Sequence, residues 1–160
     1  MEIDVRCEGL EELLKRLERM GRNTEPVLER ALERGAKRLQ AEIKPIVPVD
    51  EGTLRNSITV EKSDRLAYAV GTNLDYSIYV EYGTGKLGDP AVPHTDKERW
   101  VYFSDKLGRF VATSGQPARH FMHRGFIAGK DAAVKEVQRE VERWLILMYM
   151  SATFLKRSLR

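Results

Sequence analysis

The stretch GTGKLG, from Gly83 to Gly88, comes nearest in residue type and spacing to a known chemical site. It matches the G-x-G-x-x-G string of dinucleotide-binding proteins, whose glycines let the backbone approach a pyrophosphate at the start of a helix. Here Asp89, Pro90 and Pro93 follow in place of a helix, so no array of backbone amides would point at a phosphate. We expect a loop at this position and no nucleotide cofactor.

The histidines and the cysteine do not form a recognisable metal or catalytic site either. His120 and His123 are three residues apart and could face one way as metal ligands do, with His94 the only other histidine. No third ligand is placed beside them, so surface or helix-end histidines are the better interpretation. Cys7 is the only cysteine, which rules out an internal disulfide and fits a reducing cytosol. We expect no metal and no other cofactor.

Charged side chains are spread along the whole chain, with 27 basic and 24 acidic residues and a formal net charge of +3. Glu136, Arg139, Glu140 and Arg143 show the common pattern, in which charges three or four apart make a solvated helix face. Paired carboxylates for acid–base catalysis do not stand out from this background, so we expect no enzyme. The pI near 9.0 leaves a nucleic-acid-binding accessory protein of a mobile element as the alternative function.

The length and the apolar content predict one folded domain spanning residues 1–160. The N-terminus lacks the basic and apolar regions of a signal peptide, so we expect the protein to be made and kept in the cytoplasm. The densest apolar run, Trp144 to Met150, is far shorter than the roughly 20 residues that a membrane span needs. We therefore expect no membrane partner.

Apolar periodicity in the first third of the chain predicts one strand and two helices. Ile3 and Val5 alternate with charged residues as in a strand, and an amphipathic helix between residues 10 and 20 ends at Gly21. A second helix has Asn23 or Thr24 as its N-cap and Pro26 in its first turn, and Pro45 and Pro48 end it. The residues predicted for its buried face are Leu28, Ala31, Leu32, Gly35, Leu39 and Ile43.

After Pro48 the pattern changes to short alternating runs. It predicts a hairpin over 58–70 with its turn at Lys62–Arg65, a strand from Tyr76 to Tyr82, and a second hairpin as a projecting arm around 99–113. A long helix starts at about Phe121, and its apolar face broadens at Trp144–Met150. This broad apolar region is either a contact with another subunit or part of a core helix that the rest of the chain covers. Its predicted apolar face comprises Phe126, Ala133, Val134, Val137, Val141, Trp144, Leu145 and Met148.

These elements together predict an α+β fold. We expect a small antiparallel β-sheet packed against N-terminal helices and one long C-terminal helix, with the hairpin arm inserted before that helix.

Three segments, taken in order, resemble the signature of the siphophage head–tail joining family, often described as tail-completion proteins. They are VDEGTLRNSI from Val49 to Ile58, GTNLDYSIYVEYGTG from Gly71 to Gly85, and GQPARHF from Gly115 to Phe121. Three matched segments in sequence are more specific than any one alone. The matching residues of the first segment are Asp50, Gly52, Leu54, Arg55, Ser57 and Ile58.

The residues of the first segment fit a structural role rather than a catalytic one. Asp50 can accept amide hydrogens from the turn that follows, Gly52 permits a tight backbone, and Leu54 with Ile58 can anchor the turn in the core. Small departures from the family pattern are Glu51 in place of threonine, Ser77 in place of alanine, Tyr82 in place of phenylalanine and His120 in place of proline.

The resemblance implies a structural virion protein of a tailed phage or prophage, located in the virion neck or tail and made in the bacterial cytoplasm. It implies a homo-oligomer, with a ring possible, that joins or completes the tail at the head–tail interface and has no small-molecule substrate. Its implied partners are connector or head-completion proteins and a tail terminator or tail-tube protein. The candidate protein interface comprises Tyr76, Tyr79, Glu81, Tyr82, Gly83, Gln116, Pro117, Arg119, Phe121, Trp144 and Met148.

Overall fold

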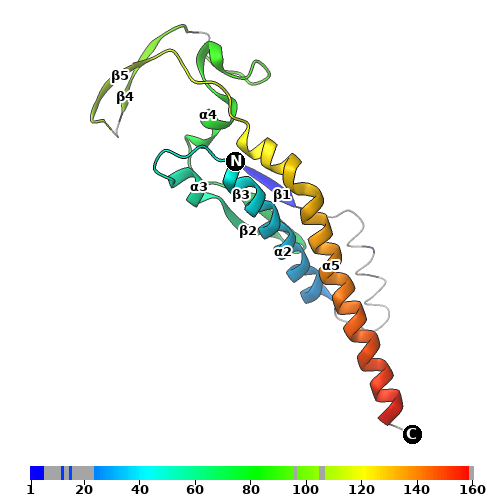
Figure 1. Ribbon diagram of the computed structural model, residues 1–160. Helices are drawn as coiled ribbons and strands as arrows, with labels where there is room; N and C mark the ends of the chain where they lie inside the picture. Colours follow the sequence, from blue (N-terminus) through cyan, green and yellow to red (C-terminus); the bar gives the residue numbers. More distant parts are fainter. Residues whose placement is uncertain (6–11, 13–14, 16–23, 96, 105–106, 159–160) are drawn as a thin grey trace.

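The computed structural model describes residues 1–5, 12, 15, 24–95, 97–104 and 107–158, and the side chains of these residues except 4, 5 and 151–158 (Figure 1). Cys7 and nearly all of the helix predicted before Gly21 lie outside these residues. The elements are β1 (Glu2–Val5), α2 (Glu25–Ile43), the 3-10 turn η1 (Lys44–Ile46), α3 (Thr53–Ser57), β2 (Thr59–Asp64), β3 (Ala67–Gly71), α4 (Ser77–Tyr82), the 3-10 turn η2 (Gly85–Leu87), β4 (Trp100–Ser104), β5 (Arg109–Thr113) and α5 (Phe121–Ser158). The predicted α+β class is confirmed.

The N-terminal strand and the first hairpin form one antiparallel sheet in the order β1-β3-β2. Val70 of the central strand lies opposite Ile3 on one side and Val60 on the other, and its side chain is fully buried. The predicted turn at Lys62–Arg65 is wrong in extent, because β2 continues through Lys62 to Asp64. A register shift between these two residues keeps the polar end of β2 paired with β3.

The helices α2 and α5 run antiparallel along one face of the sheet (Figure 1). Every residue predicted for the inner face of α2 is buried, which confirms that face. Gly35 lets the two helices approach closely, since a Cβ atom there would lie 2.5 Å from Cγ2 of Val137 and 3.2 Å from the carbonyl oxygen of Ala133. The core that the sheet and these helices share contains Ala36, Leu39, Ile43, Val47, Leu54, Ile58, Val70, Phe121, Met122 and Ala133.

Both predicted ends of α2 are confirmed. Thr24 occupies the N-cap position, where its carbonyl oxygen accepts the N–H groups of Val27 and Leu28, although its hydroxyl makes no capping bond within the described residues. At the other end Ile43 is the last α-helical residue, and Pro45 lies within the 3-10 turn η1. Proline lacks the N–H that a longer helix would need at this point.

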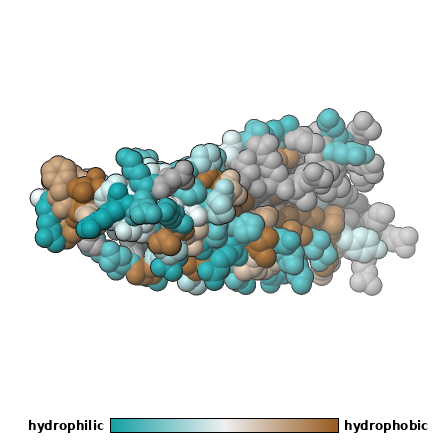
Figure 2. Space-filling view, turned by 90° about the horizontal axis from the view of Figure 1, so that it is seen from above, coloured by the Kyte–Doolittle hydropathy of each residue, from teal (hydrophilic) through white to brown (hydrophobic). Residues whose placement is uncertain are grey.

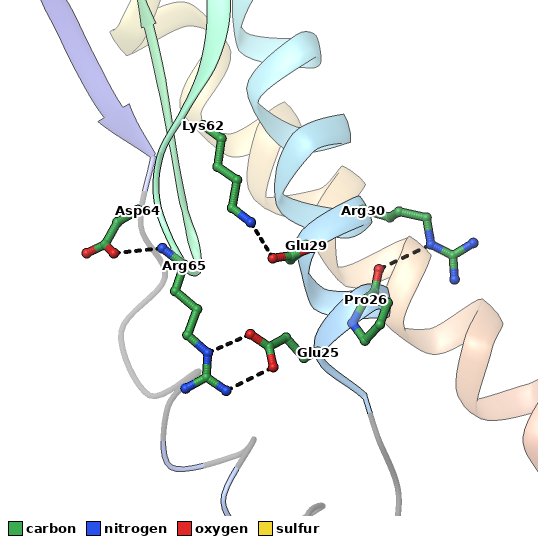
Figure 3. Close-up of polar contacts among 7 residues, drawn as sticks. All are labelled: Glu25, Pro26, Glu29, Arg30, Lys62, Asp64 and Arg65. Atoms are coloured by element: carbon green, nitrogen blue, oxygen red, sulfur yellow. Dashed lines mark hydrogen bonds and ion pairs between the residues drawn. The ribbon is translucent and has the colours of Figure 1, made fainter.

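Ion pairs attach the start of α2 to the β2–β3 turn (Figure 3). Arg65 donates two hydrogen bonds to the carboxylate of Glu25, Nε to Oε1 at 2.5 Å and Nη2 to Oε2 at 2.9 Å. Lys62 on β2 donates to Glu29, one helical turn further along α2, at 2.5 Å. The bond from Arg65 lowers the pKa of Glu25, and the bond to Glu29 raises the pKa of Lys62. These exposed contacts lie beside the buried packing of Leu66 of the hairpin against Leu28 and Leu32 of α2.

The segment Tyr76–Tyr82, predicted as a strand, is instead the helix α4 with residues Ser77–Tyr82. Its aromatic and β-branched residues favour a strand locally. The buried residues of the segment are nevertheless Ser77 and Glu81, four apart, which is helical spacing, while Ile78 and Tyr79 are exposed. Contacts with the start of α5, described below, outweigh the local preference.

The arm and the long C-terminal helix are both confirmed. Strands β4 and β5 form a hairpin that projects from the end of the molecule where α4 lies (Figure 1). Helix α5 spans 38 residues, and its C-terminal part extends beyond the start of α2 (Figure 1). Val134 and Leu145, which belong to the predicted apolar spacing, are 53% and 48% exposed, whereas Ala133 is buried. No helix in the described part of the chain has the length and apolarity to cross a membrane.

Candidate functional site

Glu81 in α4 caps the first turn of α5. Its side chain is 1% exposed, and its carboxylate accepts the backbone N–H of Met122 at 2.9 Å and that of His123 at 3.1 Å. Its own carbonyl oxygen accepts the N–H groups of Arg119 and His120 at 3.1 and 3.0 Å. The first amides of a helix have no partner within the helix, and a negative charge there also complements the helix dipole. The assignment of Glu81 to a protein interface is therefore wrong, because the side chain is buried within the chain itself.

Phe121, another candidate interface residue, is also a core residue. Its side chain is 0% exposed and packs in the cluster that joins α2, the sheet and α5. The sequence pattern identified the position correctly as the entry to α5. Its assignment to a protein interface is wrong because the whole ring is covered within the chain.

The second and third motif segments are joined by backbone hydrogen bonds. The N–H of Thr84 donates to the carbonyl of Gln116 at 2.9 Å, and the N–H of Gln116 donates back at 3.2 Å. The side-chain amide of Gln116 donates to the carbonyl of Tyr79 at 2.8 Å. Gly83 has a φ of 72°, and a Cβ atom there would lie 2.6 Å from the Gln116 carbonyl oxygen. Only glycine fits this close backbone approach at the end of α4.

The first motif segment contacts the same region. Gly52, with a φ of 80°, precedes the short helix α3 rather than a simple turn. Leu54 and Ile58 are buried, which confirms their predicted role as anchors in the core. The hydroxyl oxygens of Ser57 and Thr72 lie 2.6 Å apart and link this segment to the second one.

All three motif segments line one hollow of about 540 Å³ between α3 and α4. Segments far apart in the sequence therefore meet at a single end of the molecule. The lining residues are Pro48, Val49, Asp50, Glu51, Gly52, Thr53, Leu54, Tyr76, Val80, Gln116 and Arg119.

The remaining candidate interface residues fall into two groups. Tyr76 and Tyr79 on or beside α4 are 44% and 56% exposed, and Gln116, Pro117 and Arg119 are exposed next to them. Tyr82 is half-buried, with its ring edge-to-face against His120 at a centroid distance of 6.3 Å. Trp144 and Met148 are half-buried in the far half of α5, so the structure does not bring them to the α4 end (Figure 1).

The glycine loop and the histidines have local structural contacts. Only the three-residue turn η2 forms at Gly85–Leu87, and no α-helix begins there, as the sequence predicted. His120 has a φ of 48° just before α5, and its Nε2 lies 3.7 Å from the carboxylate of Asp89. Among the described residues, no three histidine, cysteine, aspartate or glutamate side chains are grouped closely enough to hold a metal ion.

A larger groove of about 730 Å³ lies between α4 and the base of the arm. Among the described residues that line it, none carries a carboxylate, an ammonium or a guanidinium group. Trp100 and Tyr102, which line the arm side of this groove, were not among the residues predicted from the sequence to form a site. Their alternate positions in β4 could have indicated that they share one face of the hairpin. Its aromatic lining comprises Tyr76, Tyr79, Tyr82, Trp100 and Tyr102.

Comparison with protein families matches residues 11–83 to the HK97-gp10-like family, described as "Bacteriophage HK97-gp10, putative tail-component". These residues carry the pattern of a phage tail component. The resemblance seen in the first two motif segments is thereby confirmed. No curated protein and no solved structure matches the chain. The third segment and α5 lie outside the matched range, but they are bonded to α4 within it.

Proposed function

We propose that this protein is a structural subunit of the neck or of the head-proximal end of the tail of a phage. In this role it joins or completes the tail as part of a ring, and it carries out no catalytic turnover. The observation that carries the proposal is the meeting of all three motif segments around α4. The match to a phage tail component over residues 11–83 supports the same role.

The surface at the α4 end has the chemistry of a protein interface. Tyr76 and Tyr79 offer aromatic area with a polar tip, which is enriched where proteins meet. Gln116 is held by the backbone of Thr84 and by the carbonyl of Tyr79, so the surface is ordered before a partner arrives. An ordered surface loses less conformational entropy on binding. We assign this end to assembly contacts.

The side-chain contacts do not favour the alternative of nucleic-acid binding. Three of the four basic residues of α2 pair with glutamates, Arg34 with Glu140, Lys37 with Glu33, and Arg38 with Glu42, while Arg30 donates to the carbonyl of Pro26. Nucleic-acid binding rests on cations that neutralise phosphates, and a paired cation is less available for that role. DNA binding that weakens steeply with salt would nevertheless revive this alternative.

The proposal is tested by co-expressing the protein with the connector, head-completion, tail-terminator and tail-tube proteins encoded near it. We expect one or more of them to co-purify, with rings visible by electron microscopy. Tyr79→Asp should weaken this association, and Gln138→Asp, which places the same charge on an exposed site of α5, should not. A chain that neither self-associates nor binds any of these proteins would contradict the proposal.

A further inference from the structure

The arm has two chemically different faces, because residues of a strand alternate between the two sides of a hairpin. Trp100 and Tyr102 of β4 lie on the inner face and line the groove beside α4. The outer face carries Val101 and Phe103 of β4, opposite Ala112 and Phe110 of β5 respectively. The outer face is therefore made of apolar residues alone.

The outer face is uncovered in the single chain. Val101, Phe103 and Phe110 are 62%, 51% and 72% exposed, although the two phenylalanine rings pack edge-to-face at 5.3 Å. Figure 2 shows hydrophobic side chains gathered at the end of the molecule where the arm projects. An isolated two-stranded hairpin is only marginally stable, and exposed apolar patches mark contact sites. The arm therefore needs a covering surface.

The groove beside α4 matches this outer face in chemistry. The outer face is apolar, and the groove joins an aromatic lining to the polar side chains of Thr84, His94, Thr95, Thr113 and Gln116. Neither surface contains an aspartate, glutamate, lysine or arginine that would lose its water on contact. The charges around them are mostly of opposite sign. Lys97, Arg99 and Arg109 are exposed around the arm, together with Glu98, which pairs with Lys86. Asp75 at the start of α4 and Asp50 and Glu51 of the adjoining hollow lie beside the groove, with Arg119 as a cation in that hollow. Complementary charges of this kind set orientation.

We propose that the outer face of the arm of one copy docks into the α4 groove of the next copy. This inference rests on the proposed function and specifies the contact that would build its ring. Two different surfaces of the same chain meet, which makes the contact heterologous, and such a contact builds a ring when the rotation between successive copies closes. A second copy is the occupant because this chain carries both matching surfaces, with basic residues at one and acidic residues at the other.

The contact is tested by cross-linking between two variants, each with Cys7 replaced by serine. One carries Phe110→Cys on the arm and the other carries Tyr79→Cys at the groove, and a short bismaleimide joins cysteines that lie close together. We expect covalent dimers in the mixture and few in either variant alone. Dimers of Phe110→Cys by itself would mean that two arms pack face to face, which would overturn the inference.

A second measurement compares self-association by sedimentation. Phe110→Asp should weaken it about tenfold or more, because an exposed aromatic anchor is lost. Ser104→Asp places the same charge on the inner face of β4 and keeps an acceptor for the N–H of Leu107, so association should change by less than about twofold. Circular dichroism checks that both variants fold.

The outcomes separate the two proposals. A wild-type chain that stays monomeric at high concentration, or a Phe110→Asp variant that associates normally, overturns the docking inference. Binding to the connector or tail-tube protein would still support the proposed function in that event. Cross-linking as expected without any binding to those partners supports the docking contact and counts against the neck location.

Discussion

Glu81 on α4 and Met122 on α5 are joined by a hydrogen bond of 2.9 Å between a buried carboxylate and a backbone amide, 41 residues apart in the sequence. The same carboxylate also accepts the N–H of His123. One side chain therefore fixes the start of the longest helix to the short helix that bears the exposed tyrosines. The groove and the arm base depend on this junction for their position.

Replacing Glu81 should loosen this junction. Glu81→Ala leaves the buried amide of Met122 and the partly buried amide of His123 without this acceptor, and we expect a loss of about 1–3 kcal/mol in the free energy of unfolding. Glu81→Gln keeps one acceptor and should lose less. Urea unfolding measures the stability, and hydrogen exchange should become faster at the amides of Met122 and His123. The exposed Asp75→Asn serves as control, and equal effects of Asp75→Asn and Glu81→Gln would contradict the capping role.

The close packing of α2 on α5 should not tolerate a side chain at position 35. Gly35→Ala places a Cβ atom 2.5 Å from Cγ2 of Val137, and we expect a net loss of about 1–3 kcal/mol despite the better helix propensity of alanine. Val137→Ala in the same chain should recover part of that loss, with a coupling of about 0.5–3 kcal/mol in a double-mutant cycle. Lys37→Ala, exposed on α2, should change stability by about 0.5 kcal/mol or less. Simple additivity of the first two substitutions would count against the contact.

Glu25 should contribute to the acid sensitivity of the fold. The hydrogen bond from Arg65 holds the pKa of Glu25 below its ordinary value of 4.5. A carboxyl with a lowered pKa stabilises the folded state above the unfolded pKa, and this stabilisation is lost as the pH falls through the folded pKa. Wild type and Glu25→Gln should therefore differ near neutral pH and converge in acid, with a small difference because the pair is exposed and screened by salt.

The check for Glu25 is thermal unfolding as a function of pH in low and high salt. The exposed Asp131→Asn on α5 is the matched control. A difference between wild type and Glu25→Gln that grows toward low pH would reverse the expected sign and refute the assignment.

Phe121 and Tyr79 are both candidate interface residues in the sequence. Substitutions at Phe121 should change the stability of the fold, whereas substitutions at Tyr79 should change assembly. Phe121→Ala should cost about 3–5 kcal/mol of stability, because the ring is fully buried in the core. Tyr79→Ala removes an exposed ring and should leave the unfolding midpoint nearly unchanged while weakening assembly. Thermal unfolding and sedimentation of the two variants provide the comparison, and a strong loss of stability in Tyr79→Ala would contradict it.

The sequence by itself determined the elements whose apolar spacing is regular. The inner face of α2, the first hairpin and the long helix α5 could be predicted, because burial against a core imposes a period of 3.6 or 2 on the residues that face it. The arm was predicted from its two strand-like runs on either side of the turn at 104–108. The anchoring of Leu54 and Ile58 was predicted from the first motif segment, and the absence of a helix after the glycine loop from Asp89, Pro90 and Pro93.

Only the tertiary structure decided what the residues around α4 do. The local pattern of Tyr76–Tyr82 favours a strand. In the structure the segment is a helix, which places the carboxylate of Glu81 within hydrogen-bonding distance of the backbone amides of Met122 and His123. The close approach of Gln116 to Gly83 and the hollow shared by the three motif segments depend on contacts between distant parts of the chain. The spacing of residues along the sequence does not encode such contacts. The sequence motifs therefore identified the positions around α4, but they could not distinguish buried residues such as Glu81 and Phe121 from exposed residues such as Tyr76 and Tyr79.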